Sequence, residues 1–318
     1  MRTTLVTGAS GNLGSAVVNL LLSRGHRVRA HMRSSTSTST TPDAAEPFYG
    51  DLRGGAGLEA AARGTNAVIH CASFFDADGS TDRLGIRHVI DAAASSTPHL
   101  VYISIVGVDR TTFPYFKTKL EVERMVAASG LAHTIVRATQ FHDFVHHFIA
   151  GFEDPDTQTI ALPVGLSFQS IDVGEVAQAL VAASEGDPAG RHPDIAGPEV
   201  ALDEMAKRYV QTLGLERVVT SQREDPQREF TTPSARGVIS LQIVPSSVRR
   251  TKSVETKRAQ GLFLRRGVKG LHFSKSSLGV IFSVFASLTS KSSDGFLTPR
   301  SIPEMYVRSI SVSKARSS

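Results

Sequence analysis

The sequence has a single cysteine, Cys71, and no uninterrupted apolar run approaching the length, about 18 residues, that a transmembrane helix requires. One cysteine excludes an internal disulfide and is typical of a protein kept in a reducing compartment. No signal peptide precedes the first expected strand, because Thr3 already belongs to that strand. We therefore expect a cytoplasmic protein without a membrane span.

Acidic side chains are scarce toward the C-terminus: residues 223–318 hold 17 Lys and Arg but only 6 Asp and Glu. The preceding 222 residues hold 18 basic against 24 acidic side chains, so the net charge of +5 hides two parts of opposite sign. Hydrophobic residues make up 41% and charged residues 20% of the 318, which are values typical of globular proteins. The sequence indicates an acidic globular part, with room for one large domain or two smaller ones, followed by a basic tail.

The N-terminal stretch contains three glycines spaced three apart between an aliphatic, β-branched run and a helical pattern. The run from Thr3 to Thr7 predicts a strand, and residues 13–23 predict a helix. Gly8 permits a sharp turn, Gly11 lets the backbone approach a pyrophosphate, and Gly14 lets the helix pack closely on the strand. The helix N-terminus then offers free N–H groups to phosphates. This context favours a dinucleotide site over an ordinary Gly-rich turn.

The second expected strand, residues 26–32, ends at Arg33 and runs into a polar loop, residues 34–42, that contains no carboxylate. In a dinucleotide fold this position contacts the adenosine ribose: an acidic residue binds a free 2′-hydroxyl, whereas an arginine suits a 2′-phosphate. Arg33 therefore favours NADP(H) over NAD(H). The alternative is that Arg33 is a solvated surface side chain.

Strands and helices alternate through the first half of the chain. The further expected strands cover residues 47–49, 67–72, 100–104 and 134–137, and the further expected helices cover about 82–95 and 114–129. Such alternation predicts an α/β fold with a doubly wound parallel (Rossmann) sheet that binds its ligand at the carboxyl ends of the strands. We expect the Rossmann domain in residues 1–150, a small partner region in 151–222 and the tail in 223–318.

Other residues at strand ends are candidates for cofactor contacts. Asp51, which follows the third strand with Leu52 beside it, can accept from the adenine amino group or cap the next helix. Ala72 and Ser73 end the fourth strand and are small enough to leave room for a cofactor. Cys71 has no evident base nearby and is expected to be a packed thiol rather than a nucleophile.

Three residues converge on the carboxyl edge of the expected sheet: Ser104 at the end of the fifth strand, and Tyr115 and Lys119 on the following helix. Tyr115 and Lys119 are four residues apart and so share a helix face. The Lys119 ammonium and the helix dipole both favour tyrosinate, which suits proton transfer near neutral pH, while Ser104 can orient a substrate oxygen. The alternative is a surface Tyr and Lys beside a structural serine.

These stretches together resemble the short-chain dehydrogenase/reductase superfamily, and more closely its atypical, NmrA-like NAD(P)-binding branch. The matching stretches are Thr7–Gly14, Arg33, Ser104, Tyr115–Lys119 and Val136–Phe141. Tyr-x-x-x-Lys and the upstream serine match the catalytic pattern of the superfamily, and the glycine spacing matches its atypical and extended members. The resemblance covers roughly residues 1–222 and includes residues 171–177 and 195–199.

The resemblance implies a Rossmann domain with NADP(H), followed by a small substrate-covering region. The implied cofactor turn comprises Gly8, Ser10, Gly11, Asn12, Leu13 and Gly14. Lys119 is also implied at the nicotinamide ribose, and Thr139, Gln140 and Phe141 against the nicotinamide. The branch also contains members that bind the dinucleotide as sensors and catalyse nothing.

Two further features concern other kinds of ligand. His142, His146 and His147 follow Phe141, but no third ligand is evident nearby, so we expect packing or pocket lining rather than a metal site. Residues 223–318 contain 19 serines and lack Arg–aromatic interleaving on a nucleic-acid module, so we do not expect a nucleic-acid partner. We expect this tail to be a poorly ordered extension, or an altered reading frame; the alternative is a basic arm for nucleic acid or anionic lipid.

The leading hypothesis is an NADP(H)-dependent oxidoreductase whose partner is a small-molecule substrate: a small carbonyl, enone or quinone-like compound. One alternative is a non-catalytic dinucleotide sensor that binds a protein partner. Another is a sugar-nucleotide epimerase, which uses the same site chemistry and retains its cofactor.

Overall fold

The structure, a computed structural model, describes residues 1–33, 42, 44–74, 76, 78–111, 113–222 and 249–250. The Ser- and Thr-rich loop and nearly all of the basic tail expected from the sequence lie outside these residues. The chain divides into two units, and every described residue belongs to the first of them.

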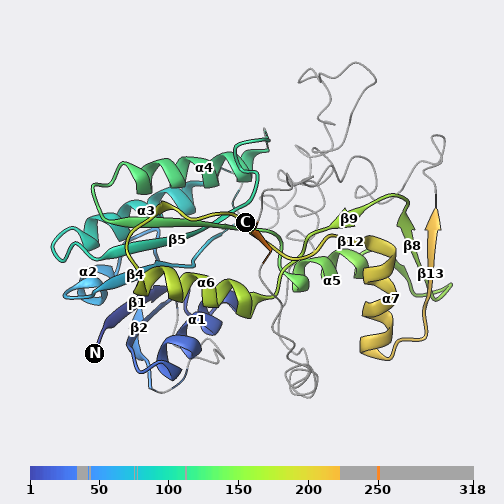
Figure 1. The fold of residues 1–318 in the computed structure, drawn as a ribbon, viewed down its shortest axis with the longest axis horizontal. Coiled ribbons are helices and arrows are strands. Elements are labelled where there is room, and N and C mark those ends of the chain that lie inside the picture. The colour runs from blue at the N-terminus through green and yellow to red at the C-terminus, as the bar shows by residue number, and fades with distance from the viewer. Residues whose placement is uncertain are drawn as a thin grey trace, which may run out of the picture. The chain divides into compact units, whose positions relative to one another are not determined.

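A parallel sheet forms the centre of this unit, in the order β3–β2–β1–β4–β5–β6–β11–β14, with β10 also paired to β6 (Figure 1). The strands are β1 (Thr3–Thr7), β2 (Arg27–Met32), β3 (Glu46–Tyr49), β4 (Ala67–His70), β5 (His99–Ile105), β6 (His133–Ala138), β10 (Gly190–Arg191), β11 (Ile195–Ala196) and β14 (Arg249–Arg250). The strand order reverses between β1 and β4, and doubly wound folds bind ligands at the carboxyl ends beside such a reversal. The expected fold class is confirmed.

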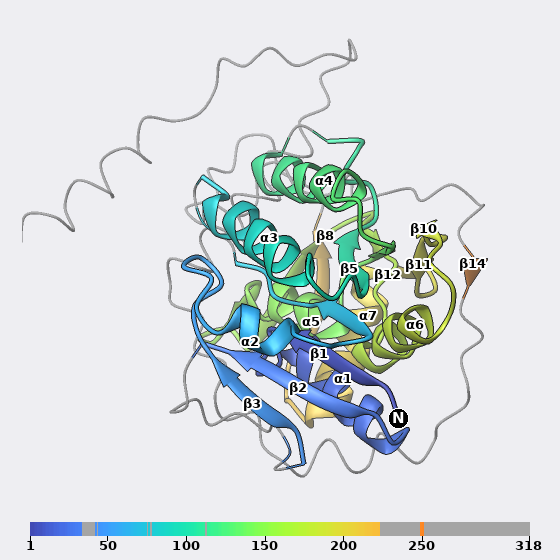
Figure 2. The same ribbon diagram turned by 90° about the vertical axis from the view of Figure 1, so that its left-hand side faces the viewer.

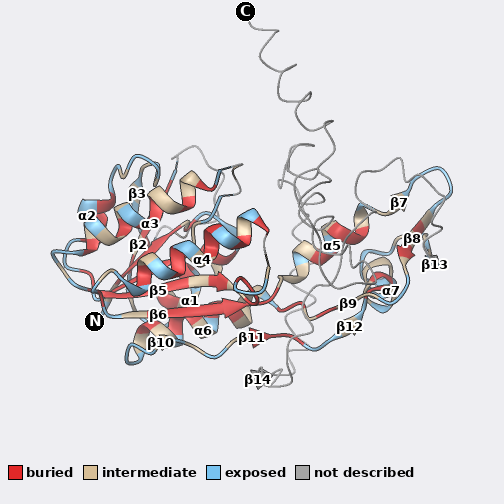
Figure 3. Cartoon of the chain, turned by 90° about the horizontal axis from the view of Figure 1, so that it is seen from above, coloured by how far each residue is buried: buried red, intermediate tan, exposed pale blue. Residues whose placement is uncertain are grey.

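Helices cover both faces of the sheet (Figure 2). One face carries α1 (Asn12–Ser23) and α6 (Val173–Glu185), and the other carries α2 (Leu58–Ala62), α3 (Ser80–Ala93) and α4 (Pro114–Ala127). Successive side chains of a strand point to opposite faces, so Val6 packs in the α1/α6 core and Leu5 in the α2/α3/α4 core. Figure 3 shows the buried residues concentrated along the strands and on the helix faces turned toward them.

A second, smaller group of elements continues beyond the carboxyl ends of the strands (Figure 1). It contains α5 (His142–Ala150), β7 (Glu153–Asp154), β8 (Thr159–Pro163), β9 (Ser167–Phe168), β12 (Val200–Ala201), α7 (Leu202–Leu213) and β13 (Val218–Gln222). Strand β8 pairs with β7 and β13, and β9 pairs with β12. A domain boundary near residue 150 stays a prediction; after it, α6, β10 and β11 return to the main sheet.

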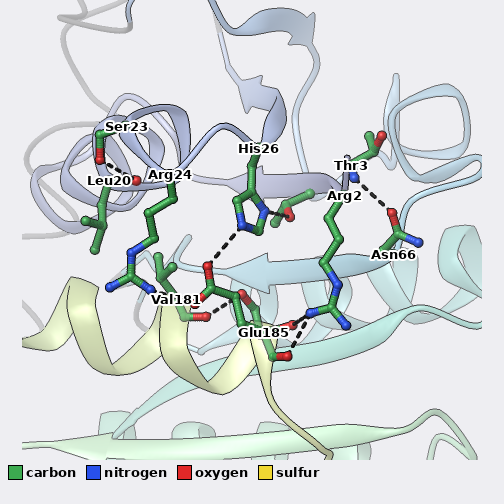
Figure 4. Close-up of polar contacts among 11 residues, drawn as sticks. Arg2, Thr3, Leu20, Ser23, Arg24, His26, Asn66, Val181 and Glu185 are labelled. Carbon is green, nitrogen blue, oxygen red and sulfur yellow. Dashed lines mark hydrogen bonds and ion pairs between the residues drawn. The ribbon is translucent and has the colours of Figure 1, made fainter.

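A polar cluster ties the end of α6 to the amino ends of the strands (Figure 4). The Glu185 carboxylate lies 2.6 Å from Arg24 Nη1 and 3.0 Å from His26 Nε2. Arg2 Nη1 donates to the carbonyl oxygens of Ser184 and Glu185, at 3.2 and 2.8 Å, where a cation suits the negative end of the helix dipole. We call these four side chains (Arg2, Arg24, His26 and Glu185) the Glu185 clasp.

None of the helices in the described part of the chain has both the length and the hydropathy needed to cross a bilayer.

Candidate functional site

The glycine turn after β1 is held by close backbone packing. Gly8 has φ +68°, and a Cβ there would lie 2.7 Å from the Cα of Ala72. A Cβ on Gly14 would lie 2.0 Å from the Gly8 carbonyl oxygen, so α1 packs directly on the turn, as the glycine spacing predicts. The lack of a side chain on Gly8 therefore also lets Ala72, which follows β4, lie beside the turn.

The N-terminus of α1 has the features of an anion site. Its N-cap residue is Gly11, with φ −79°, and no side-chain hydrogen bond caps the helix. The first turn of α1 contains no acidic residue, so its N–H groups are suited to a phosphate. A Cβ on Gly11 would meet only the Gly8 oxygen, at 3.2 Å, which leaves the backbone open to a ligand. The cradle therefore fits the pyrophosphate of a dinucleotide.

The other residues of the expected cofactor turn have different surroundings. Ser10 is exposed. Asn12 Nδ2 donates to Asp143 Oδ2 at 2.7 Å and thereby links the turn to the first turn of α5. Leu13 is 6% exposed and packs in the α1/α6 core, so only its backbone can contribute to a phosphate site.

Arg33 follows β2 and lies beside the segment that follows β4. Its side chain is exposed, and its guanidinium carbon lies 5.7 Å from the centre of the Phe74 ring, a cation–π distance. Phe74 is itself 48% exposed and comes directly after Ala72 and Ser73. The basic side chain proposed for the ribose phosphate thus lies next to small and aromatic groups at the carboxyl edge of the sheet.

Asp51 does not cap the next helix. Its Oδ1 accepts the Arg53 N–H at 2.9 Å, whereas α2 begins after Gly57 without a side-chain cap. The helix-capping alternative is therefore wrong, because a local turn takes this carboxylate oxygen before the chain enters α2. Leu52 packs against the α2/α3/α4 core, and its carbonyl oxygen lies 2.8 Å from His88 Nδ1.

The structure brings two of the three expected catalytic residues together. Lys119 Nζ lies 5.6 Å from the centre of the Tyr115 ring, and the Tyr115 hydroxyl lies 3.0 Å from Ser73 Oγ. Ser104, at the carboxyl end of β5, is 2% exposed. Its Oγ has no hydrogen-bond partner among the described residues, so a substrate oxygen reaching it would satisfy an otherwise unpaired buried group.

The sequence did not indicate the partner of Lys119, which is Asp82 in the first turn of α3. Lys119 Nζ and Asp82 Oδ2 are 3.0 Å apart, and the two side chains are 4% and 5% exposed. Asp82 also accepts from Ser73 Oγ at 2.9 Å and from the Phe74 N–H at 2.7 Å. Asp82 lies 37 positions before Lys119 and shares no motif with it, so no local pattern in the sequence could have identified this pair.

Lys119 stays charged despite its burial. Burial lowers the pKa of the Lys119 ammonium, but interactions with its neighbours, among them the charge of Asp82, raise it above its ordinary value. Tyr102 is 1% exposed, with its ring centre 5.5 Å from Lys119 Nζ. Burial raises the pKa of Tyr102, although the nearby Lys119 charge opposes the rise, so Tyr102 stays neutral at physiological pH.

The hydrogen-bond directions around Tyr115 follow from the chemistry of Asp82. An ionised carboxylate only accepts hydrogen bonds, so the single Ser73 hydroxyl proton is directed to Asp82. The Ser73 oxygen is then an acceptor toward Tyr115, and the Tyr115 O–H is the donor.

Two titratable groups beneath the turn are neutral at physiological pH. His70, at the end of β4, is 2% exposed; its Nδ1 lies 2.7 Å from Thr7 Oγ1, and its ring stacks on Tyr102. Burial, reinforced by the Lys119 charge, lowers the pKa of His70 to about 4. Burial raises the pKa of the Cys71 thiol to about 12, which agrees with the expected packed thiol.

Residues 139–141 follow β6 and are held in place by backbone hydrogen bonds. The Thr139 N–H donates to the Ile195 carbonyl oxygen at 3.1 Å, and the Gln140 carbonyl oxygen accepts from Ile171 at 2.9 Å. Phe141 is the N-cap residue of α5 and packs partly against the α1/α6 core. Residues 169–171 and 195 therefore hold the segment expected beside the nicotinamide.

The histidines of α5 have separate environments. His142 Nδ1 lies 2.8 Å from Ser170 Oγ, the His146 ring lies beside Tyr209, and His147 Nδ1 lies 2.6 Å from the Asp143 carbonyl oxygen. Within the described ranges, no group of three His, Cys, Asp or Glu side chains is arranged to hold a metal ion.

A glycine turn that leads from the first strand into an uncapped helix, at the reversal point of a doubly wound sheet, defines a dinucleotide-binding protein. The model of the NAD(P)H-binding family matches residues 8–185, more than half of the chain. The chain therefore belongs to this family.

Curated relatives are similar over part of the chain. Sterol demethylase protein B of Methylococcus capsulatus is 42% identical over 73 residues, which are 23% of this chain and 22% of that protein. The divinyl chlorophyllide a 8-vinyl-reductase of Zea mays is 31% identical over 161 residues, covering 44% of this chain and 40% of that protein. The photosystem II assembly factor Ycf39 of Trieres chinensis is 28% identical over 145 residues, covering 43% and 46%. The chain spans less than half the length of each of these relatives.

Solved structures share the fold at low sequence identity. The enzyme WbmH of Bordetella bronchiseptica in complex with NAD+ has a TM-score of 0.59 and 17% identity, covering 71% of this chain and 87% of that one. The UDP-glucose 4-epimerase of Thermus thermophilus in complex with NAD has a TM-score of 0.55 and 20% identity, covering 71% and 88%. The family match and these structural neighbours agree with the resemblance to the short-chain dehydrogenase/reductase superfamily, while its NmrA-like branch and the activity of the chain stay predictions.

Proposed function

We propose that the protein is an NADP(H)-dependent oxidoreductase that reduces a small carbonyl, enone or quinone-like compound, as in the NmrA-like branch. The observation that carries this proposal is the Tyr115 hydroxyl, which lies 3.0 Å from Ser73 Oγ and on the same helix as the buried Lys119 ammonium, at the carboxyl edge of a dinucleotide-binding sheet. When bound, the reduced dinucleotide supplies a hydride to the substrate. Tyr115 supplies the proton to the substrate oxygen, and the Ser104 hydroxyl, which has no hydrogen-bond partner within the described part of the chain, orients that oxygen.

Each part of the chain has a role in this proposal. The turn from Gly8 to Gly14 and the N-terminus of α1 bind the pyrophosphate. Arg33 binds the 2′-phosphate of NADP(H), because its exposed guanidinium follows β2 and the polar loop after it contains no carboxylate. Residues 139–141 lie against the nicotinamide, and elements from residues 151–222 cover the substrate.

The remaining cofactor contacts are assigned by position. Ala72 packs against Gly8 in the glycine turn. Ala72 and Ser73 are proposed to leave room for the dinucleotide, and Asp51 and Leu52 to lie near the adenine. Lys119 is proposed to contact the nicotinamide ribose while it remains paired with Asp82. A ribose hydroxyl is compatible with this pair, because an ammonium has three N–H donors.

The test is the consumption of NADPH and NADH by the full chain across a panel of quinones, aldehydes and enones. Tyr115→Phe keeps the aromatic ring but removes the transferable proton, so turnover should fall by about 10²–10⁴-fold while NADPH affinity changes little. Tyr49→Phe is the matched control: it removes a hydroxyl from a tyrosine that is 47% exposed on β3, and it should turn over like the wild type. Equal rates for Tyr115→Phe and the wild type would refute the assigned role.

The second candidate is a dinucleotide-binding sensor without catalysis. It is favoured by the burial of Ser104, at 2% exposure, and by the pairing of Lys119 with Asp82, both of which oppose easy access to the catalytic groups. A sensor would bind NADPH and turn over no member of the panel, whereas an epimerase would keep bound cofactor through gel filtration without net oxidation of added NADPH.

A further inference from the structure

We propose that Asp82 is a positioning residue that holds Tyr115 in its protonated, donating state, by pairing with Lys119 and fixing the direction of the Ser73 hydrogen bond. This inference rests on the proposed function, since it concerns the same Tyr115. It assigns a role in the reaction to two residues, Asp82 and Ser73, that the Tyr-x-x-x-Lys pattern does not contain.

The geometry makes Asp82 the centre of the network. Its Oδ2 atom lies 3.0 Å from Lys119 Nζ and 2.9 Å from Ser73 Oγ, and its Oδ1 atom accepts the Phe74 N–H at 2.7 Å. Asp82 and Lys119 come from different helices, α3 and α4, and both side chains are more than nine-tenths buried. A carboxylate fixed by three donors has little freedom to turn away from the site.

The electrostatic consequence concerns the balance between tyrosine and tyrosinate. An unpaired ammonium beside a phenol favours tyrosinate, which acts as a base. Here the Asp82 charge lies two hydrogen bonds from the Tyr115 oxygen and offsets the Lys119 charge. The Ser73 oxygen, with its own proton committed to Asp82, accepts from the Tyr115 O–H and stabilises the protonated form further. The site is thereby set to donate a proton, which is what reduction of a carbonyl requires.

The first experiment replaces the charge. Asp82→Asn keeps the shape of the side chain but removes the negative charge, so Tyr115 should form tyrosinate at lower pH. Removing a unit charge that lies two hydrogen bonds from the Tyr115 oxygen should shift the Tyr115 titration by about one to two pH units. Ultraviolet difference spectroscopy of the full chain without dinucleotide measures this titration directly, and the Tyr115→Phe variant identifies the component that belongs to Tyr115. The alkaline limb of kcat/KM for reduction should move by the same amount.

Glu123→Gln is the matched control. Glu123 is another buried carboxylate on α4, and it binds Arg137 Nε and Nη2 at 2.8 and 2.6 Å, outside the Tyr115 network. Its replacement removes the same charge from a buried pair, so it should cost comparable stability without moving the Tyr115 titration. A shift of equal size in Glu123→Gln would mean that Asp82 acts only through the general charge of the protein, and would overturn the proposal.

The second experiment tests the direction of the Ser73 hydrogen bond and remains informative if Asp82→Asn does not fold. Ser73 is exposed, so Ser73→Ala should fold. If Ser73 accepts from Tyr115, its removal favours tyrosinate and moves the titration to lower pH; if Ser73 donates to Tyr115, the titration moves to higher pH. A move to higher pH, or no move, would overturn the proposal. Because this readout needs no substrate, a wild type that turns over nothing would refute the proposed reductase without deciding the role of Asp82.

Discussion

Acid should destabilise the protein in part through His70, the buried histidine at the end of β4. Burial, reinforced by the Lys119 charge, lowers the pKa of His70 from 6.5 to about 4. Because the unfolded chain then binds the proton first, this contribution to stability is complete above about pH 6.5 and declines as the pH falls toward 4. At about 1.4 kcal/mol per pKa unit, the shift corresponds to a loss of about 3 kcal/mol in the free energy of unfolding across this window.

The assay is urea unfolding of the full chain across this pH window, for the wild type and for His70→Gln. Glutamine keeps a polar group near Thr7 but does not ionise. The free energy of unfolding of His70→Gln should therefore fall by about 2–3 kcal/mol less than that of the wild type over the window. Burial also lowers the pKa of His31 and His99, so part of the slope should remain. The control His192→Gln, on a half-exposed histidine, should keep the wild-type slope. An unchanged slope in His70→Gln would refute the reasoning.

Two further predictions concern the cofactor. Gly11→Val should abolish dinucleotide binding in calorimetry, because the added atoms point at the pyrophosphate cradle. The thermal unfolding midpoint should change little, because φ −79° suits any residue. An unchanged affinity for the dinucleotide would contradict the assignment of the cradle. NADPH should bind more tightly than NADH, and Arg33→Ala should weaken NADPH binding about ten- to a hundredfold, since a hydrogen bond to a charged group contributes about 1.5–3 kcal/mol; equal affinity of the wild type for both cofactors would contradict the role of Arg33.

Local patterns in the sequence were sufficient to predict the dinucleotide half of the fold. The run from Thr3 to Thr7 is a strand as expected, and α1 begins at Asn12, within a residue of the expected start. The helix expected at about residue 82 begins at Ser80, and the strand expected to reach residue 72 ends at His70. These sequence patterns are reliable because the apolar residues that form each pattern are the ones buried in the sheet or between the sheet and its helices.

Features that depend on distant pairing could not be predicted in this way. Strands β9 and β12 have two residues each, too few for a period to emerge, and their paired residues lie 32 and 34 positions apart in the sequence. The site shows the same limit. Tyr115 and Lys119 share one helix face and were found by spacing, whereas Asp82 meets Lys119 only because α3 and α4 pack side by side.

The Glu185 clasp has a consequence for how the protein folds during its synthesis on the ribosome. Arg2 donates to a carbonyl oxygen that lies 183 positions further along the chain, and the apolar face of α1 packs against α6, which ends at Glu185. A nascent chain that already contains the whole glycine turn therefore still lacks α6, against which α1 packs in the finished fold. Contacts so distant in sequence form late in folding. The emerging N-terminal half should accordingly be a chaperone client until translation has passed α6.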